Sequence, residues 1–167
     1  MNSLQRLAQA PRRINLAGAL LCFGLVAVAL ALEVWQGLEP CPLCVFQRVA
    51  FLFMGAALLF GALMPGLIAM TGVALGALAG IGLAARHLWL QSLPADQVPA
   101  CGPGLSYLLD SMPLNRVLSQ VLAGSGECAE VDVVLGLSIP LWTLIAFVLI
   151  GGVFTVVNGM ARQTRPA

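Results

Sequence analysis

Two cysteines lie two residues apart in the sequence CPLC, residues 41–44, directly before a long apolar segment. A disulfide across so short a loop adds little stability, and CxxC pairs are common at redox-active sites. Arg48 follows Cys44 by four residues, so on a helix both would share one face. The free N–H groups at a helix N-terminus and the arginine charge both favour a thiolate at Cys44. The spacing therefore predicts a reactive cysteine pair, although an arginine here could instead bind lipid phosphate.

Three further cysteines lie elsewhere in the chain. Cys22 is inside an apolar run, where we expect a small buried hydrophobe. Cys101 and Cys128 are far apart in a later segment. Together with Cys41 and Cys44 they allow three disulfide connectivities. A local Cys41–Cys44 bond would leave Cys101 to pair with Cys128. A purely structural bridge suits that second pair by its spacing. Structural zinc usually needs two close pairs, so we expect no metal.

The composition indicates where these cysteines act. The chain of 167 residues is 60% hydrophobic and only 9% charged, with a net charge of +1 and no lysine. A soluble domain of this length needs a more charged surface, so the chain is predicted to be an integral membrane protein. No basic run is long enough to indicate binding to nucleic acid.

Four apolar runs are each long enough to cross a hydrocarbon core of about 30 Å as a helix. They cover residues 14–32, 45–63, 67–85 and 141–157. We therefore predict an all-α membrane protein, a four-helix bundle forming one domain over residues 1–167, with outer loops at about 33–44 and 86–140. The arginine pair and "ALALE" around the first run resemble a secretory signal, but the run is longer than usual for one. We interpret it as an uncleaved first span.

The arginines predict the orientation of the spans. They cluster before the first span and after the fourth, at Arg6, Arg12, Arg13, Arg162 and Arg165. The two longer connections are mainly acidic, with Glu33, Glu39, Asp96, Asp110, Glu127, Glu130 and Asp132 against Arg116. The positive-inside rule then puts both termini in the cytoplasm and both cysteine pairs on the outer side. Trp35, Trp89 and Trp142 fall at the outer span ends, where indoles prefer to lie.

The second outer loop contains a short amphipathic pattern. In "SMPLNRVLSQVLAGSG" the apolar residues recur at helical spacing, at Leu114, Val117, Leu118, Val121 and Leu122. Ser111 suits an N-cap, Pro113 a first turn and Gly124 a C-terminal stop. We expect a short interfacial helix on the outer membrane surface. It leads into Cys128 through "AGSGEC", a flexible tether of the kind a disulfide relay needs.

These residues together resemble the DsbB family of bacterial disulfide-forming proteins. The resemblance consists of CPLC followed by Gln47 and Arg48, His87 at the end of the third span, and the later cysteine pair. The segments "SGECAE" and "LGLSIPLW" strengthen it, and it covers nearly the whole chain. It implies a multi-pass protein of the bacterial inner membrane that reoxidises a DsbA-like periplasmic thiol oxidase. It also implies that the electrons pass to a quinone, ubiquinone or menaquinone.

The resemblance implies a role for each site residue. Cys101 would be attacked by the DsbA thiolate, and Cys128 would then attack Cys41 and free Cys44. Cys44 would contact the quinone, with Arg48 polarising a quinone oxygen and His87 nearby. The sequence departs from the family at "CAEVDVVLGL", where a tryptophan often follows "CAE". That departure concerns packing near the quinone rather than the cysteine relay.

Other functions remain to be compared with this one. A membrane scaffold or transporter could use the disulfides structurally, but a transporter should place ionisable residues near the bilayer midplane, and the four predicted spans show none there. A reductase of the vitamin K epoxide type also carries a CxxC beside the membrane. Its second cysteine pair precedes that motif, whereas here it follows. A paralogue that serves a different thiol partner is a further alternative.

Overall fold

The computed structural model describes residues 3–37, 40–64, 66–94, 96–102 and 104–163, with the side chains of residues 11–162 among them. In this part of the chain, four helices are long and apolar enough to cross a membrane. They are α1 (Ser3–Gln36), α2 (Pro42–Leu63), α3 (Leu67–Gln91) and α6 (Ile139–Gln163). The predicted all-α, four-helix membrane fold is confirmed. Glu39 and Arg165, and the side chain of Arg6, lie outside what is described.

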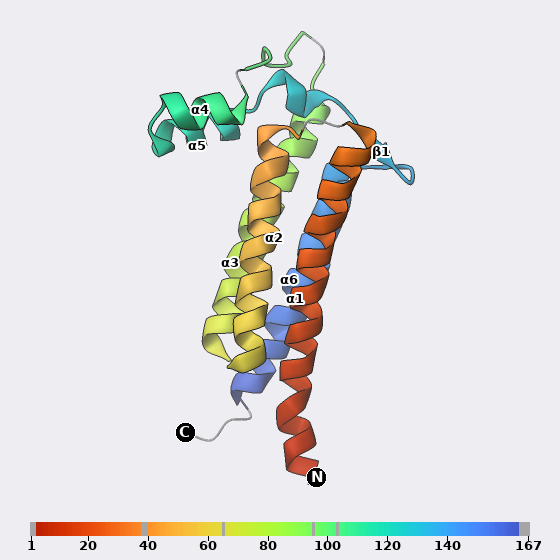
Figure 1. Cartoon of the computed structure of the whole chain (residues 1–167), viewed down its shortest axis with the longest axis vertical. Coiled ribbons are helices and arrows are strands. Elements are labelled where there is room, and N and C mark those ends of the chain that lie inside the picture. The colour runs from red at the N-terminus through yellow and green to blue at the C-terminus, as the bar shows by residue number, and fades with distance from the viewer. Residues whose placement is uncertain (1–2, 38–39, 65, 95, 103, 164–167) are drawn as a thin grey trace.

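The helices extend beyond the predicted apolar runs at both ends of the bundle. The end that carries the two longer connecting segments is called the loop end; both termini lie at the opposite, terminal end (Figure 1). The third helix continues past residue 85 to Gln91, so that Arg86 and His87 are still helical. Helix α2 begins at Pro42, three residues earlier than predicted, because proline is well tolerated in a first turn. The cysteine pair is thereby part of the helix start.

The bundle core is made of apolar side chains at the centre of the helices. Phe51 of α2 stacks on Phe147 of α6 with ring centroids 3.9 Å apart. Gly80 of α3 lies directly against the Phe147 ring, where a side chain would collide with it. Such small residues allow membrane helices to approach closely. Cys22 is fully buried in the same cluster, as expected of a small hydrophobe.

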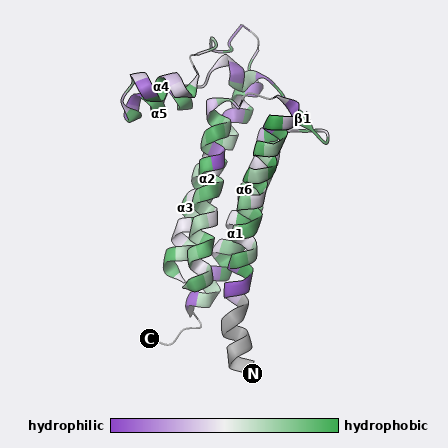
Figure 2. Cartoon of the chain, in the orientation of Figure 1, coloured by the Kyte–Doolittle hydropathy of each residue, from purple (hydrophilic) through white to green (hydrophobic). Residues whose placement is uncertain are grey.

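The helix surfaces remain apolar along most of the bundle, as colouring by hydropathy shows (Figure 2). Large exposed side chains include Leu20, Leu78 and Leu149, which a soluble protein would bury. Lipid is the solvent that such a surface fits.

A buried pair of amides joins the helices near the terminal end. Asn15 Nδ2 donates to Asn158 Oδ1 at 2.9 Å, and Asn158 Nδ2 donates back to Asn15 Oδ1 at 2.8 Å. Asn15 also donates to the Gly61 carbonyl oxygen at 3.0 Å. Helices α1, α6 and α2 are therefore tied together by polar contacts inside an apolar bundle.

The loop end carries a set of short elements. They are α4 (Leu105–Ser111), α5 (Leu114–Ala123), the 3₁₀ helix η1 (Gly126–Ala129), and the antiparallel strands β1 (Val133–Val134) and β2 (Leu137–Ser138). Helix α5 matches the amphipathic pattern, with Val117 and Val121 buried, and it ends at Gly124 with φ 85°. Ser111 as its N-cap was wrong. Ser111 is the last residue of α4, and its hydroxyl bonds the Tyr107 carbonyl instead.

Arg86 fixes the end of α5 to α3. Its guanidinium donates to the carbonyl oxygens of Leu122 and Ala123, each at 2.8 Å, and it stacks on Trp89 at 4.1 Å. A cation at a helix C-terminus satisfies carbonyls that lack partners within the helix. The segment that leads to Cys128 therefore begins at a helix end that Arg86 fixes to α3.

Candidate active site

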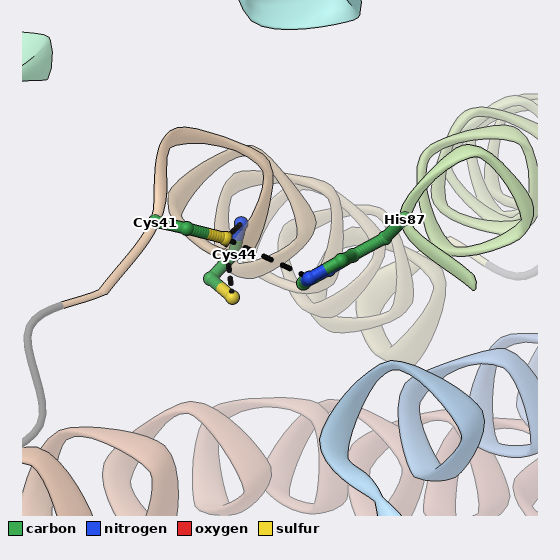
Figure 3. A group of neighbouring side chains, drawn as sticks. All are labelled: Cys41, Cys44 and His87. Carbon is green, nitrogen blue, oxygen red and sulfur yellow. Dashed lines mark hydrogen bonds between the residues drawn. The ribbon is translucent and has the colours of Figure 1, made fainter. Parts of the chain in front are cut away.

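Cys41 occupies the N-cap position of α2. Its backbone is extended, and its sulfur accepts a hydrogen bond from the Cys44 backbone N–H at 3.3 Å. The sulfurs of Cys41 and Cys44 lie 2.9 Å apart (Figure 3). Cys44 is the third residue of α2 and so lies in its first turn, as the sequence predicted. Its own free backbone N–H points to the Cys41 sulfur.

Cys128 of η1 reaches the same place from the second loop. Its side chain is buried in one apolar cluster with Cys41, and it hydrogen-bonds to the Cys41 thiol. The hydrogen bond from Cys41 lowers the pKa of Cys128 to about 5, with further help from the backbone N–H groups of Ser125 and Leu43. The reciprocal contacts with Cys128 and then Cys44 raise the pKa of Cys41. Cys41 is therefore the shared neighbour of two other sulfurs.

Cys101 is placed differently from the other three loop-end cysteines. It is exposed, whereas Cys41 and Cys128 are buried. A side chain at Gly126, two residues before Cys128, would come within 2.9 Å of the Cys101 sulfur, and the Gly126 N–H bonds the Ala100 carbonyl at 3.3 Å. Cys101 thus lies at the surface beside the turn that carries Cys128. An external thiol can reach it without entering the bundle.

His87 points from α3 toward the cysteine pair (Figure 3). Its Nε2 lies 3.9 Å from the Cys41 sulfur, and its Nδ1 lies 3.3 Å from Nε2 of Gln47 on α2. The Gln47 carbonyl oxygen accepts a 2.7 Å hydrogen bond from the Thr143 hydroxyl on α6. No role was predicted for Gln47 or Thr143. The amide of Gln47 inside an apolar run could have indicated such a contact, because polar side chains in membrane helices hydrogen-bond to neighbouring helices.

Arg48 lies one turn below Cys44 on α2, as the spacing predicted. Its charge acts on Cys44, and its Nη1 contacts Oε2 of Glu33 on α1 at 2.5 Å. Glu33 was predicted only as an acidic loop residue. It lies in the last turn of α1, which packs alongside α2.

The ligand atoms of Cys41, Cys44 and His87 all lie within 4.8 Å of one another. Two thiolates and an imidazole at such distances are a donor set that zinc accepts. A resident metal would, however, occupy both sulfurs that a CxxC disulfide needs. Metal binding and disulfide chemistry therefore exclude each other at this site.

The fold and the site define an integral membrane protein with a group of neighbouring thiols at one end of its helix bundle. The family described as "Disulfide bond formation protein DsbB" matches the chain over residues 11–157. The chain belongs to the DsbB family.

Individual relatives show the same relationship. A "Disulfide bond formation protein B" of Hahella chejuensis is 51% identical over 158 residues, which cover 87% of this chain and 92% of that protein. The protein of the same name from Nitrosococcus oceani is 48% identical, over 84% of this chain and 86% of its own length. The one from Acinetobacter baylyi is 54% identical, over 73% and 75%.

Proposed function

We propose that this chain is a protein-disulfide oxidoreductase that reoxidises a DsbA-type thiol protein and passes the electrons to a quinone. The observation that carries the proposal is the position of Cys41, whose sulfur contacts both Cys44 and Cys128. A sulfur between two others can exchange its disulfide partner with little movement of the chain. The family name supports disulfide formation as the activity.

The thiol steps begin from two disulfides, Cys101–Cys128 and Cys41–Cys44. A thiolate of the partner attacks the Cys101 sulfur, forms a mixed disulfide, and releases Cys128 as a thiolate. The backbone N–H groups of Ser125 and Leu43 lower the pKa of Cys128 and favour it as a leaving group, and the exposure of Cys101 makes the attack possible. Cys128 then attacks Cys41, which forms the Cys41–Cys128 bond and releases Cys44.

The partner leaves when its second thiolate attacks the mixed disulfide and frees Cys101. Cys101 then attacks Cys128, which restores Cys101–Cys128 and releases Cys41. The two electrons of the partner dithiol now reside on Cys41 and Cys44. Oxidation of this pair restores its disulfide and completes the cycle.

The residues near Cys44 fit a quinone, either ubiquinone or menaquinone. A quinone supplies a two-electron acceptor with two carbonyl oxygens that accept hydrogen bonds. Arg48 has five N–H donors, and its contact with Glu33 uses one nitrogen, Nη1. His87 offers its Nε2 beside the cysteine pair, and Cys44 itself is only partly buried. Arg48 and His87 would hold the two oxygens.

The location follows from the same proposal. Disulfide formation requires an oxidising compartment, so the loop end should face the periplasm from the bacterial inner membrane. The arginines near both termini then lie on the cytoplasmic side, as the positive-inside rule requires.

Purified protein tests the function directly. With a reduced thioredoxin-fold donor and a water-soluble quinone, the wild type should reduce quinone at a rate that depends on both substrates. A scaffold with structural disulfides would show no turnover. A paralogue for another partner would turn over with a small dithiol and fail with DsbA-type donors.

A further inference from the structure

A chain of polar contacts runs through the apolar bundle and ends at Cys41. The Thr143 hydroxyl lies 2.7 Å from Gln47 Oε1, Gln47 Nε2 lies 3.3 Å from His87 Nδ1, and His87 Nε2 lies 3.9 Å from the Cys41 sulfur. Gln47 and His87 are each only 3% exposed, so these contacts are shielded from water. Three helices contribute to the chain, namely α6, α2 and α3.

The direction of each hydrogen bond follows from which atoms carry hydrogen. Gln47 Oε1 has none, so the Thr143 hydroxyl donates to it, and this turns the amide Nε2 toward the imidazole. The amide N–H₂ can only donate, so His87 Nδ1 accepts and carries no proton. A neutral imidazole then has its single proton on Nε2, the nitrogen that faces Cys41.

We propose that Gln47 and Thr143 are positioning residues that hold His87 as a neutral N–H donor toward the Cys41 sulfur. The catalytic role of this N–H donor rests on the proposed function. When an incoming thiolate breaks the Cys41–Cys128 bond, the electron pair goes to the Cys41 sulfur. The Nε2–H donates to that anion without giving up its proton.

Cys41 is the sulfur that needs such a donor. The contact with Cys44 and burial both remain when Cys41 leaves, and both raise its pKa, so its thiolate is disfavoured. A raised pKa makes a poorer leaving group in thiol exchange. A fixed N–H donor offsets this at the step in which Cys41 leaves.

One competing arrangement exists. The Thr143 hydroxyl also lies 2.9 Å from the Pro140 carbonyl oxygen. If Thr143 donated there, the Gln47 amide could rotate by half a turn, donate to Thr143, and accept from His87 Nδ1. That arrangement would leave Nε2 without a proton and His87 as an acceptor facing Cys41.

The tautomer can be measured without any assay of activity. The chain has a single histidine, so ¹⁵N-histidine labelling gives two ring signals that belong to His87 alone. In reduced wild-type protein we expect a protonated Nε2 and a bare Nδ1. Gln47→Glu should move a proton to Nδ1, since a carboxylate only accepts, and Gln47→Leu should give a mixture. A bare Nε2 in the wild type, or ring signals unchanged in Gln47→Leu, would overturn the proposal.

Thr143 supplies a matched pair of variants. Thr143→Ser keeps the hydroxyl and should keep the wild-type ring signals, whereas Thr143→Val should shift them. Cleavage of the Cys41–Cys128 bond by a small thiol should slow by about three- to tenfold in Thr143→Val, the effect of losing one neutral hydrogen bond. It should be near normal in Thr143→Ser. Equal rates in Thr143→Val and the wild type would contradict the role of the hydroxyl.

The two proposals fail in different ways. An Nε2-protonated ring in a wild type that reduces no quinone would sink the function and leave the hydrogen-bond order standing. Normal turnover with a bare Nε2 would sink the positioning role alone.

Discussion

Arg48 on α2 contacts Glu33 on α1, with Nη1 and Oε2 2.5 Å apart. The two side chains are 20% and 28% exposed, so the pair is partly shielded from solvent at the loop end of the bundle. This contact holds the guanidinium beside the helix start that carries Cys44. The arginine is thereby fixed in position by a second helix rather than left free at the membrane surface.

The first prediction concerns this arginine. A rigid cationic donor near a developing oxyanion is worth about 2.7–4 kcal/mol, so Arg48→Ala should slow quinone reduction roughly a hundred- to thousandfold. Arg48→Lys keeps the charge but loses the planar fork, so its rate should be intermediate. Steady-state kinetics against quinone concentration measures both. If Arg48 only binds lipid phosphate, its variants should express less well but show unchanged kinetics per folded molecule.

The second prediction separates the two cysteine pairs. Cys101→Ala should abolish turnover with a DsbA-type donor, because the exposed entry sulfur is missing. It should leave quinone reduction by a small dithiol intact, because Cys41 and Cys44 remain in place. Cys44→Ser should abolish both activities while the protein still inserts. Full oxidation of the protein donor by Cys101→Ala would show that the order of the relay is wrong.

The third prediction follows from the pKa of Cys128, which the Cys41 hydrogen bond lowers to about 5 from the ordinary value of 9.0. Thiolate absorbance of the reduced protein should show a step near pH 5 whose amplitude is smaller in Cys128→Ser by one thiolate. Because the folded pKa is the lower one, ionisation stabilises the reduced fold fully above about pH 9, and this stabilisation is lost as pH falls to 5. Cys41→Ala removes the main cause and should move the step upward. An unmoved step would exclude Cys41 as that cause.

The fourth prediction tests the contact between the two parts of the second loop. A Cβ at residue 126 would lie 2.9 Å from both the Cys101 sulfur and the Pro99 carbonyl oxygen, so Gly126→Ala must displace Cys101 from the Cys128 turn. Oxidation of a protein donor should slow, whereas small-dithiol turnover should not. Gly102→Ala is the control, because its Cβ would meet only Ser125, at 3.9 Å. Equal slowing in both variants would point to a general loop effect.

The fifth prediction concerns stability alone. Asn158→Leu removes both hydrogen bonds between the two amides and leaves the buried Asn15 Oδ1 without a donor, which should cost about 1–3 kcal/mol. The double variant Asn15→Leu with Asn158→Leu should lose less than the sum of the single variants, because no orphaned amide remains. Thermal unfolding in detergent measures this. Turnover per folded molecule should stay unchanged, since the pair lies near the terminal end; reduced turnover would couple it to the site.

Local features of the chain were enough to predict the membrane fold and the cysteine pair. Each span is recognised from its own apolar run, because a bilayer of about 30 Å sets the length of helix that must be apolar. The Cys41–Cys44 contact and the position of Arg48 one turn further are likewise properties of a single helix start. Even here the cap of α5 was wrong, because an unpredicted helix, α4, took Ser111 as its last residue.

Contacts between helices were decided only by the tertiary structure. Glu33 meets Arg48, and Thr143 meets Gln47, because α1 and α6 pack on α2 with particular faces. Those faces depend on the fit of side chains such as Phe51 and Phe147 along the whole bundle, which no short stretch of sequence contains. Cys128 reaches Cys41 for the same reason. Arg86 of α3 holds the end of α5, from which the chain continues to Cys128. Only the assembled fold therefore brings the sulfurs of Cys41 and Cys128 together.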